Sequence, residues 1–187
     1  MNQEKEKIRK KIKEIRQKID LKLWEEKSRK IQEFFLLSEF YKNSKIIFTY
    51  FHFDKEVKTD LIIEKSLEEK KVVCIPYIDW KNKIIIPSII NSFRDIDTSR
   101  KIPAPKTLNL LDKNLIDIII VPGVAFDIYK NRIGMGGGFY DRFLKEVPSK
   151  IKKISFAFEF QVLTKRLPVN EEDVKVDAII TEKRIIS

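Results

Sequence analysis

A chain of 187 residues is expected to form one domain, with a core large enough to fold without disulfide bonds or structural metals. Charged residues make up 35% and hydrophobic residues 43% of the sequence, which excludes a disordered chain. The formal net charge of +10 favours anionic partners. Lysines are nevertheless spread along the whole chain, so the charge alone does not separate a solvated surface from a nucleic-acid-binding face.

Cysteine content and hydropathy indicate the kind of cellular compartment in which the protein is found. Cys74 is the single cysteine, so no disulfide can form within the chain, which suits a reducing environment. The first residues are charged where a signal peptide needs an apolar core, and no apolar run reaches the length of a membrane span. We therefore expect a cytoplasmic protein that does not associate with a membrane.

The first third of the sequence predicts two helices followed by a strand. A helix over about 5–17 is predicted from apolar residues spaced three to four apart: Ile8, Ile12, Ile15 and Ile19. A second helix is predicted over 21–37, and the side chains expected to be buried on it are Leu23, Trp24, Ile31, Phe34 and Phe35. Residues 45–51 are rich in β-branched and aromatic side chains, as is typical of a strand.

The middle of the sequence is less regular. Residues 60–70 predict a helix with Thr59 as a possible N-cap. The following segment, 71–78, predicts a short buried strand closed by Pro76. Residues 83–89 are consistent with another strand, and two prolines after it indicate a stiff loop.

The last third repeats the alternation of strands and helices. Residues 115–123 form a nearly continuous Ile/Val run, typical of a strand buried on both faces. A helix is predicted over 139–147, and two further strands over 152–160 and 176–182. Alternating strands and helices without a linker predict a single α/β domain, residues 1–187, with a mainly parallel sheet.

The glycines are concentrated in one segment, "RIGMGGGFYD". Four of the five glycines in the chain fall within 134–138, after a buried strand and before a helix. Adjacent glycines allow backbone N–H groups to converge on an anion, and the helix start adds a favourable field. Arg132 could add a charged fork for phosphate oxygens. The segment lacks both the P-loop ending and the dinucleotide fingerprint; a ligand-binding loop is favoured over a plain tight turn.

Asp141 follows the glycine segment directly. A carboxylate beside bound phosphate is repelled unless a cation lies between them, and Mg²⁺ commonly takes one or two carboxylates together with phosphate oxygens. The alternative is that Asp141 only stabilises the first turn of its helix through the dipole. From the residues alone, both interpretations stay open.

Several segments together resemble one family. Residues 121–144, "VPGVAFDIYKNRIGMGGGFYDRFL", resemble the signature of the 5-formyltetrahydrofolate cyclo-ligase family. Further segments are similar to that family in the same order along the chain: "KEKIR", "FHFDKEVKT", "IPAPK" and "LPVNEEDVKVDAIITE". The resemblance covers nearly the whole chain.

The resemblance implies a fold and a reaction. The fold would be a three-layer α/β domain similar to that of sugar-phosphate isomerases and CoA-transferases. The reaction would convert 5-formyltetrahydrofolate, with or without a polyglutamate tail, into 5,10-methenyltetrahydrofolate with release of ADP and phosphate from ATP. Mg²⁺ would assist. Phosphorylation of the formyl oxygen would make it a leaving group and allow N10 to close the ring.

The resemblance also implies site residues. Arg132 would be catalytic, and two metal contacts would come from Asp141 and Asp177. The implied nucleotide-binding residues are Lys5, Arg9, Arg132, Ile133, Gly134, Met135, Gly136, Gly137, Gly138, Phe139 and Tyr140. The implied substrate-binding residues are Phe51, Glu56, Met135, Gly136, Gly137, Gly138 and Phe139.

The chain departs from the family pattern at four positions. Asn131 stands where glycine is common, and Met135 replaces a common Tyr or Arg. Gly137 replaces a frequent lysine, which removes one phosphate contact, and Phe139 replaces a tyrosine that could donate a hydrogen bond.

Other functions remain to be weighed. A module that binds nucleotides or nucleic acid without chemistry would suit the basic charge, although nucleic acid is the less favoured partner. A sugar-phosphate isomerase-like enzyme is an analogy at the level of the fold. His52 is interpreted as a structural histidine, and Trp24 and Trp80 as core or rim residues. The oligomeric state is not predicted.

Overall fold

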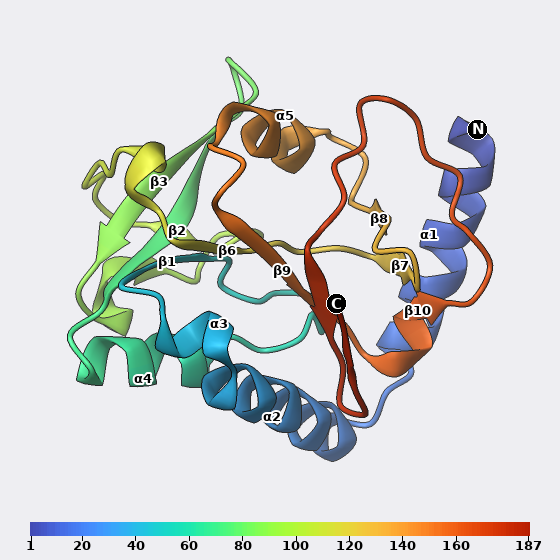
Figure 1. Cartoon of the computed structure of the whole chain (residues 1–187), viewed down its shortest axis with the longest axis horizontal. Helices are drawn as coiled ribbons and strands as arrows, with labels where there is room; N and C mark the ends of the chain where they lie inside the picture. The colour runs from blue at the N-terminus through green and yellow to red at the C-terminus, as the bar shows by residue number, and fades with distance from the viewer.

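The computed structural model covers residues 1–187 and is built around a seven-stranded sheet in the order β12-β11-β9-β6-β1-β2-β3 (Figure 1). The strands of this sheet are β1 (Ile46–Thr49), β2 (Val72–Asp79), β3 (Ile84–Ile90), β6 (Ile118–Ile120), β9 (Lys152–Phe156), β11 (Ala178–Ile180) and β12 (Ile185–Ile186). The five inner strands pair in parallel, and β3 and β12 pair antiparallel at the two edges. The predicted, mainly parallel sheet is confirmed.

Helices cover both faces of this sheet. They are α2 (Leu21–Leu37), α3 (Glu39–Lys42), α4 (Asp60–Glu68) and α5 (Phe139–Glu146), while α1 (Asn2–Gln17) lies off this sheet; short 3₁₀ turns occur at Phe93–Asp95, Lys113–Leu115 and Glu159–Gln161. On one face, α2 buries Ile31 and Phe35 in the same cluster as Ile118 of β6. On the other, α5 buries Phe143 in the same cluster as Ile119. Neighbouring residues of one strand thus point into two cores, which confirms the three-layer α/β fold (Figure 1).

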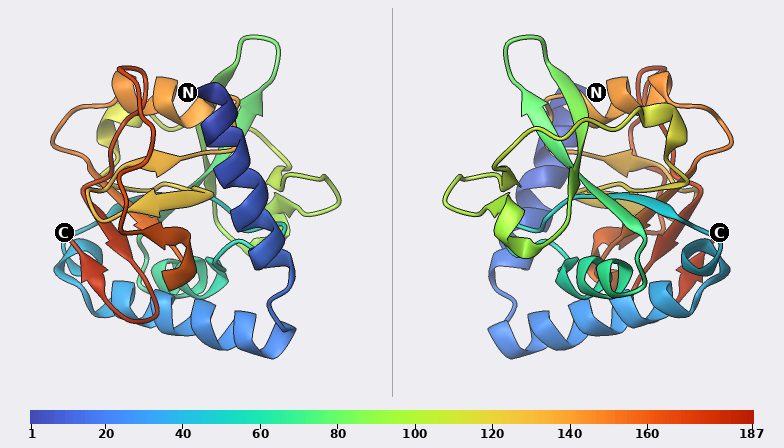
Figure 2. Two further views of the ribbon diagram at one scale, coloured as in Figure 1. Left: turned by 90° about the vertical axis from the view of Figure 1, so that its right-hand side faces the viewer. Right: turned by 90° about the vertical axis from the view of Figure 1, so that its left-hand side faces the viewer.

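Two small sheets stand beside the main one. Their strands are β4 (Ile96–Asp97) with β5 (Ala104–Pro105), and β7 (Ala125–Asp127) with β8 (Arg132–Ile133) and β10 (Val162–Leu163). Helix α1 lies beside β7 and β8 rather than on the main sheet (Figure 2). Its Ile12 is buried with Ala125, Ile133 and Leu167. No helix is both long enough and apolar enough to cross a membrane.

Two strand predictions needed correction. The strand that was expected to close at Pro76 continues to Asp79, with Pro76 opposite Pro87 of β3. The pairing of β2 with β1 ends at Phe48 opposite Cys74, so Pro76 interrupts no pairing with β1. The segment between β6 and α5, expected to be a loop, holds the β7–β8 hairpin before it reaches the glycines.

The inward face of α1 also differs from the apolar stripe that its sequence predicts. Ile15 is 38% exposed, whereas Lys5 and Arg16 are only 5% and 1% exposed. Arg16 pairs with Asp54 at 3.1 Å. Similarly, Leu23 of α2 is exposed rather than buried. On α1, the cationic side chains that are buried are those that pair with an acidic residue elsewhere in the fold. An unpaired cation would be too costly to bury.

The β7–β8 hairpin is held by one buried carboxylate, that of Asp127. It accepts hydrogen bonds from the backbone N–H groups of Tyr129, Asn131 and Leu167, each at 2.8–2.9 Å, and from Asn131 Nδ2 at 2.7 Å. Lys130 takes a left-handed conformation, with φ of 68°, inside this turn. Asp127 therefore fixes the position of β8 and of Arg132, the first residue of that strand.

Replacing this carboxylate tests that role. Asp127→Asn turns one acceptor oxygen into an NH₂ group that faces N–H donors, so the free energy of unfolding should fall by about 2 kcal/mol. Asp112→Asn is the matched control: Asp112 is exposed and accepts only from Asn114, and its loss should cost clearly less. Urea denaturation measures both, and equal losses would contradict the role given to Asp127.

Candidate active site

A cleft of about 620 Å³ opens where β1, β2 and β6 reach their carboxyl ends. One wall comes from β1 and β2 and the residues after them, including Phe51, Glu56 and Ile78. The opposite wall comes from α1 and from the segment between β8 and α5. Ligands of open α/β sheets bind at this edge, so the cleft lies where the strand order predicted a site.

The glycine loop, residues 134–138, forms part of this wall, and its shape requires glycine. Gly136 and Gly138 have φ of +107° and +66°, values that other residues rarely adopt. A Cβ on Gly137 would lie 2.8 Å from Cδ2 of Phe139.

Two cations of α1 face this loop, as the resemblance implies. Arg9 donates from Nε to the carbonyl oxygen of Gly134 at 2.8 Å, and a Cβ on Gly136 would lie 3.6 Å from Arg9 Cζ. Lys5 is buried in the cleft and pairs with Asp173. The structure therefore brings Lys5 and Arg9 together with the glycine loop, although the two segments are far apart in sequence.

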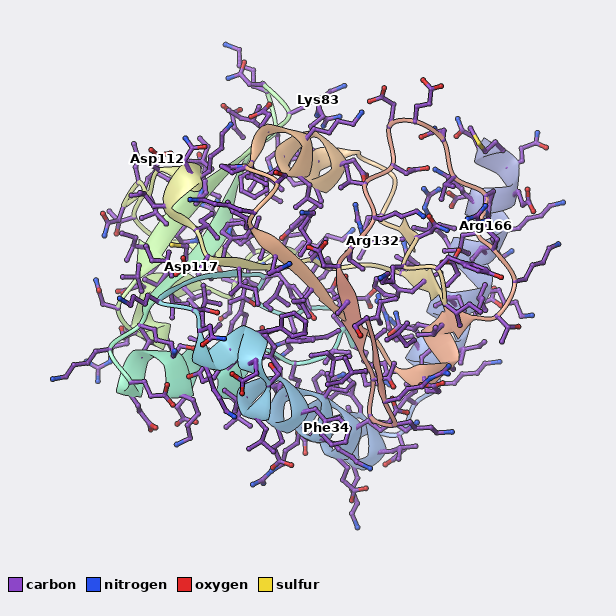
Figure 3. The ribbon with its side chains drawn as sticks, in the orientation of Figure 1. Phe34, Lys83, Asp112, Asp117, Arg132 and Arg166 are labelled. Atoms are coloured by element: carbon purple, nitrogen blue, oxygen red, sulfur yellow. The ribbon has the colours of Figure 1, made fainter.

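Arg132 is buried at β8, between the main sheet and α1 (Figure 3). It donates to Asp141 Oδ1 at 2.6 Å and to the carbonyl oxygen of Pro122 at 3.2 Å, while its Nε has no partner. Asp141 Oδ1 also accepts from the backbone of Val174 at 3.1 Å. The other carboxylate oxygen of Asp141, Oδ2, accepts no hydrogen bond from the protein. The two predicted residues thus form one ion pair in the cleft.

Glu56 is the buried acid of the cleft. Its carboxylate accepts only one hydrogen bond, from the backbone of Phe53 at 3.3 Å, and burial raises its pKa from 4.5 to about 7, against the opposing field of Arg16. The Glu56 carbonyl oxygen accepts from the indole of Trp24 at 2.8 Å, which holds the segment. Phe51, the other predicted substrate residue, also lines the cleft. The site therefore offers a carboxyl group that titrates near neutral pH.

Asp177 does not reach the cleft. It directly precedes β11, at the amino end of the parallel strands, whereas the cleft lies at their carboxyl ends. Its carboxylate accepts from the backbone N–H of Lys153 at 2.7 Å and lies 3.5 Å from the Lys153 ammonium. Asp177 thus anchors β11 to β9, and the structure separates it from Asp141, contrary to the predicted pair of metal contacts.

Some residues of the site have no clear signal in the sequence. Asp173 pairs with Lys5, and the charge of Arg16 acts on Glu56. Both partners are distant in sequence, so no local spacing indicates these interactions. Trp80 was interpreted as a core or rim residue; it is 63% exposed on the cleft rim, 5.2 Å from the Phe139 ring between centroids. His52 lies between Trp24 and Phe51, and burial lowers its pKa, in keeping with a structural histidine.

The comparisons with known proteins support the same family as the residues. The profile of the 5-formyltetrahydrofolate cyclo-ligase family matches residues 1–182. The chain belongs to this family. It is 30% identical to the 5-formyltetrahydrofolate cyclo-ligase of Mus musculus over 153 residues, which cover 76% of this chain and 75% of the relative. It is 31% identical to that of Escherichia coli K12 over 141 residues, covering 73% and 77%.

Solved structures of cyclo-ligase relatives have the same fold. The 5,10-methenyltetrahydrofolate synthetase of Aquifex aeolicus superposes with a TM-score of 0.84 at 30% identity, covering 97% of this chain and 91% of that one. The corresponding synthetase of Mycoplasma pneumoniae gives a TM-score of 0.77 at 24% identity, with coverage of 95% and 98%. The cyclo-ligase fold therefore extends over almost the whole chain.

The buried acid gives a prediction on pH. Because the folded state holds the Glu56 proton more tightly than the unfolded state, Glu56 costs stability as the pH rises from 4.5 through about 7. Relative to Glu56→Gln, the wild type should lose about 3 kcal/mol of unfolding free energy over this range. Chemical denaturation between pH 4 and 8 measures the difference.

The control for this measurement is Glu64→Gln. Glu64 is exposed on α4, so this variant should follow the wild-type pH dependence. A Glu56→Gln curve that runs parallel to the wild type would contradict a buried, protonated Glu56.

Proposed function

We propose that this chain converts 5-formyltetrahydrofolate into 5,10-methenyltetrahydrofolate at the expense of ATP, releasing ADP and phosphate. The observation that carries the proposal is the meeting of three elements in one cleft: a cation-lined glycine loop, the buried Arg132 and the buried acid Glu56. Phosphoryl transfer needs positioning and charge neutralisation, and the loop side of the cleft is built for both.

The nucleotide is proposed to bind at the loop side. Backbone N–H groups of residues 133–140 and the side chains of Lys5, Arg9 and Arg132 would neutralise the phosphates. These cations have protein partners in the structure, namely Asp173, the Gly134 carbonyl and Asp141. Phosphate oxygens would compete for the same donors, so the cations are positioned before the nucleotide arrives.

The folate is proposed to bind at the opposite wall. Glu56 would take the polar edge of the pterin, because a carboxyl group that titrates near pH 7 can accept from ring N–H groups. Phe51 offers an apolar face beside it, and the side chains of Met135 and Phe139 lie on the loop between the two substrates. In this arrangement the formyl group would lie next to the terminal phosphate.

The chemistry then follows in two steps. The formyl oxygen forms a bond to the γ-phosphorus while the bond from this phosphorus to ADP breaks. N10 next attacks the formyl carbon and loses its proton, and the C–O bond breaks as phosphate leaves. Arg132, a planar and permanently charged group, would stabilise the negative charge on the transferred phosphoryl group, which is its proposed catalytic role.

Asp141 fits a magnesium ion. Mg²⁺ typically takes one or two protein carboxylates and fills its other positions with water and substrate phosphates, and Asp141 Oδ2 carries no protein hydrogen bond. The structure has no group of three or more His, Cys, Asp or Glu residues that would hold a metal without a substrate. Bound Mg²⁺ would neutralise phosphate charge, and Asp141 is the proposed protein contact.

The length of the folate tail and the cellular location of the protein remain predictions. A polyglutamylated substrate and a cytoplasmic location rest on the basic charge and on the residue pattern alone. A binding module without chemistry is less favoured, because such a module has no need to keep Arg132, Asp141 and Glu56 in one cleft.

The reaction is tested by the absorbance of the methenyl product. Purified protein with 5-formyltetrahydrofolate, ATP and Mg²⁺ should produce this chromophore. Omitting ATP should abolish its formation, and removing divalent metal with EDTA should suppress it until Mg²⁺ is restored. If folded protein forms no chromophore under the complete conditions, the proposed function is wrong.

The role of Arg132 is tested by Arg132→Lys. Lysine keeps the charge but loses the planar fork that serves Asp141 and Pro122 together, so kcat should fall by about 10²-fold. Arg29→Lys is the control, since Arg29 is exposed and pairs only with Glu33, at 2.9 Å. Turnover of Arg132→Lys within twofold of the wild type would remove Arg132 from the reaction.

A further inference from the structure

The hydroxyl group of Tyr140 is buried in the protein and has no hydrogen-bond partner. Tyr140 lies in the first turn of α5, directly before Asp141, and lines the cleft. Buried polar groups in folded proteins are nearly always paired, so an orphaned hydroxyl calls for an explanation.

The neighbouring side chains have hydrogen-bond partners, although Arg132 Nε itself has none. The Tyr50 hydroxyl donates to the Val57 carbonyl oxygen at 2.9 Å, Arg132 donates to Asp141, and the Glu56 carboxylate accepts from the backbone of Phe53. Tyr140 thus carries the one phenolic O–H in the cleft that is free to donate to a bound molecule.

The position of Tyr140 lies between the two proposed subsites. The charged groups that act on its hydroxyl are Glu56, from the folate side, and Arg132, from the phosphate side. A phenol keeps its proton at neutral pH, so the hydroxyl can act as a hydrogen-bond donor. In the proposed complex, the atom between these two subsites is the formyl oxygen, which joins the formyl carbon to phosphorus.

We propose that Tyr140 is a further catalytic residue, whose hydroxyl donates a hydrogen bond to the formyl oxygen of the folate. This proposal rests on the function proposed above. This hydrogen bond would act in the second step of the reaction. As N10 bonds to the formyl carbon, the C–O bond breaks and its electron pair goes to the oxygen that leaves with phosphate. A hydrogen bond to that oxygen stabilises the charge that develops on it. The tyrosine proton is not transferred.

This role explains why the hydroxyl is unpaired in the structure. A protein partner would compete with the substrate, whereas an orphaned donor gains its hydrogen bond only when the reacting oxygen arrives. The cost of leaving the hydroxyl unpaired falls on the free protein, and a hydrogen bond to the substrate removes this cost in the complex.

The chain contains a matched control in Tyr41. The Tyr41 hydroxyl is also buried without a hydrogen-bond partner, but Tyr41 lies in α3, in the core cluster with Phe35, and does not line the cleft. Tyr140→Phe and Tyr41→Phe therefore remove the same kind of group, one inside the cleft and one outside it.

The experiment compares steady-state kinetics and thermal unfolding of the two variants with those of the wild type. For Tyr140→Phe we expect kcat to fall about 10²-fold, with KM for ATP and for 5-formyltetrahydrofolate within threefold of the wild type. Its melting temperature in the absence of ligand should not fall, and should rise by about 2–4 °C if the orphaned hydroxyl costs its usual amount. Tyr41→Phe should keep the wild-type kcat.

Three results would overturn the proposal: kcat of Tyr140→Phe within twofold of the wild type, a loss of kcat accompanied by a lower melting temperature, or an equal loss of kcat in Tyr41→Phe. Failure of the underlying function gives a different result, because the wild type itself would then form no methenyl product with ATP.

Discussion

The guanidinium of Arg132 and the carboxylate of Asp141 meet at 2.6 Å across the base of the glycine loop. Arg132 stands just before the loop on β8, and Asp141 just after it on α5, so this ion pair holds both ends of the loop together. Asp127 fixes the hairpin that delivers Arg132, and the Val174 backbone holds Asp141 from the other side. A loop whose glycines allow many conformations is thereby confined to one.

The other cations of the site resemble Arg132, because each already has an acceptor in the free protein. Lys5, Arg9 and Arg132 each contact an acceptor of the protein. Burial of an unpaired charge is costly, and these acceptors remove that cost in the free protein. In the proposed complex, a phosphate chain would take over hydrogen bonds from these acceptors. Glu56 is handled differently: it has one weak backbone donor, and its pKa rises to about 7.

Periodicity in the sequence predicted the large elements well, because α2, β1, β9 and β11 each carry a residue pattern that local geometry alone explains. The glycine loop could be located from the order of strand, glycines and helix. The β7–β8 hairpin was missed, since strands of two or three residues are too short to show a period. The burial of Lys5 and Arg16 depends on Asp173 and Asp54, which no local pattern connects to α1. Asp177 was misplaced because similarity to a family position does not say at which end of a strand the residue lies.

Helix α1 packs on the small sheet through Ile12, yet it supplies two of the four cations that line the cleft beside the glycine loop, the others being Arg132 and Arg142. A bound nucleotide would therefore touch the first helix of the chain and the body of the domain at once. Through thermodynamic linkage, any free energy of nucleotide binding that depends on Lys5 and Arg9 also opposes detachment of α1. The protection of α1 from hydrogen exchange would then rise with the concentration of ATP.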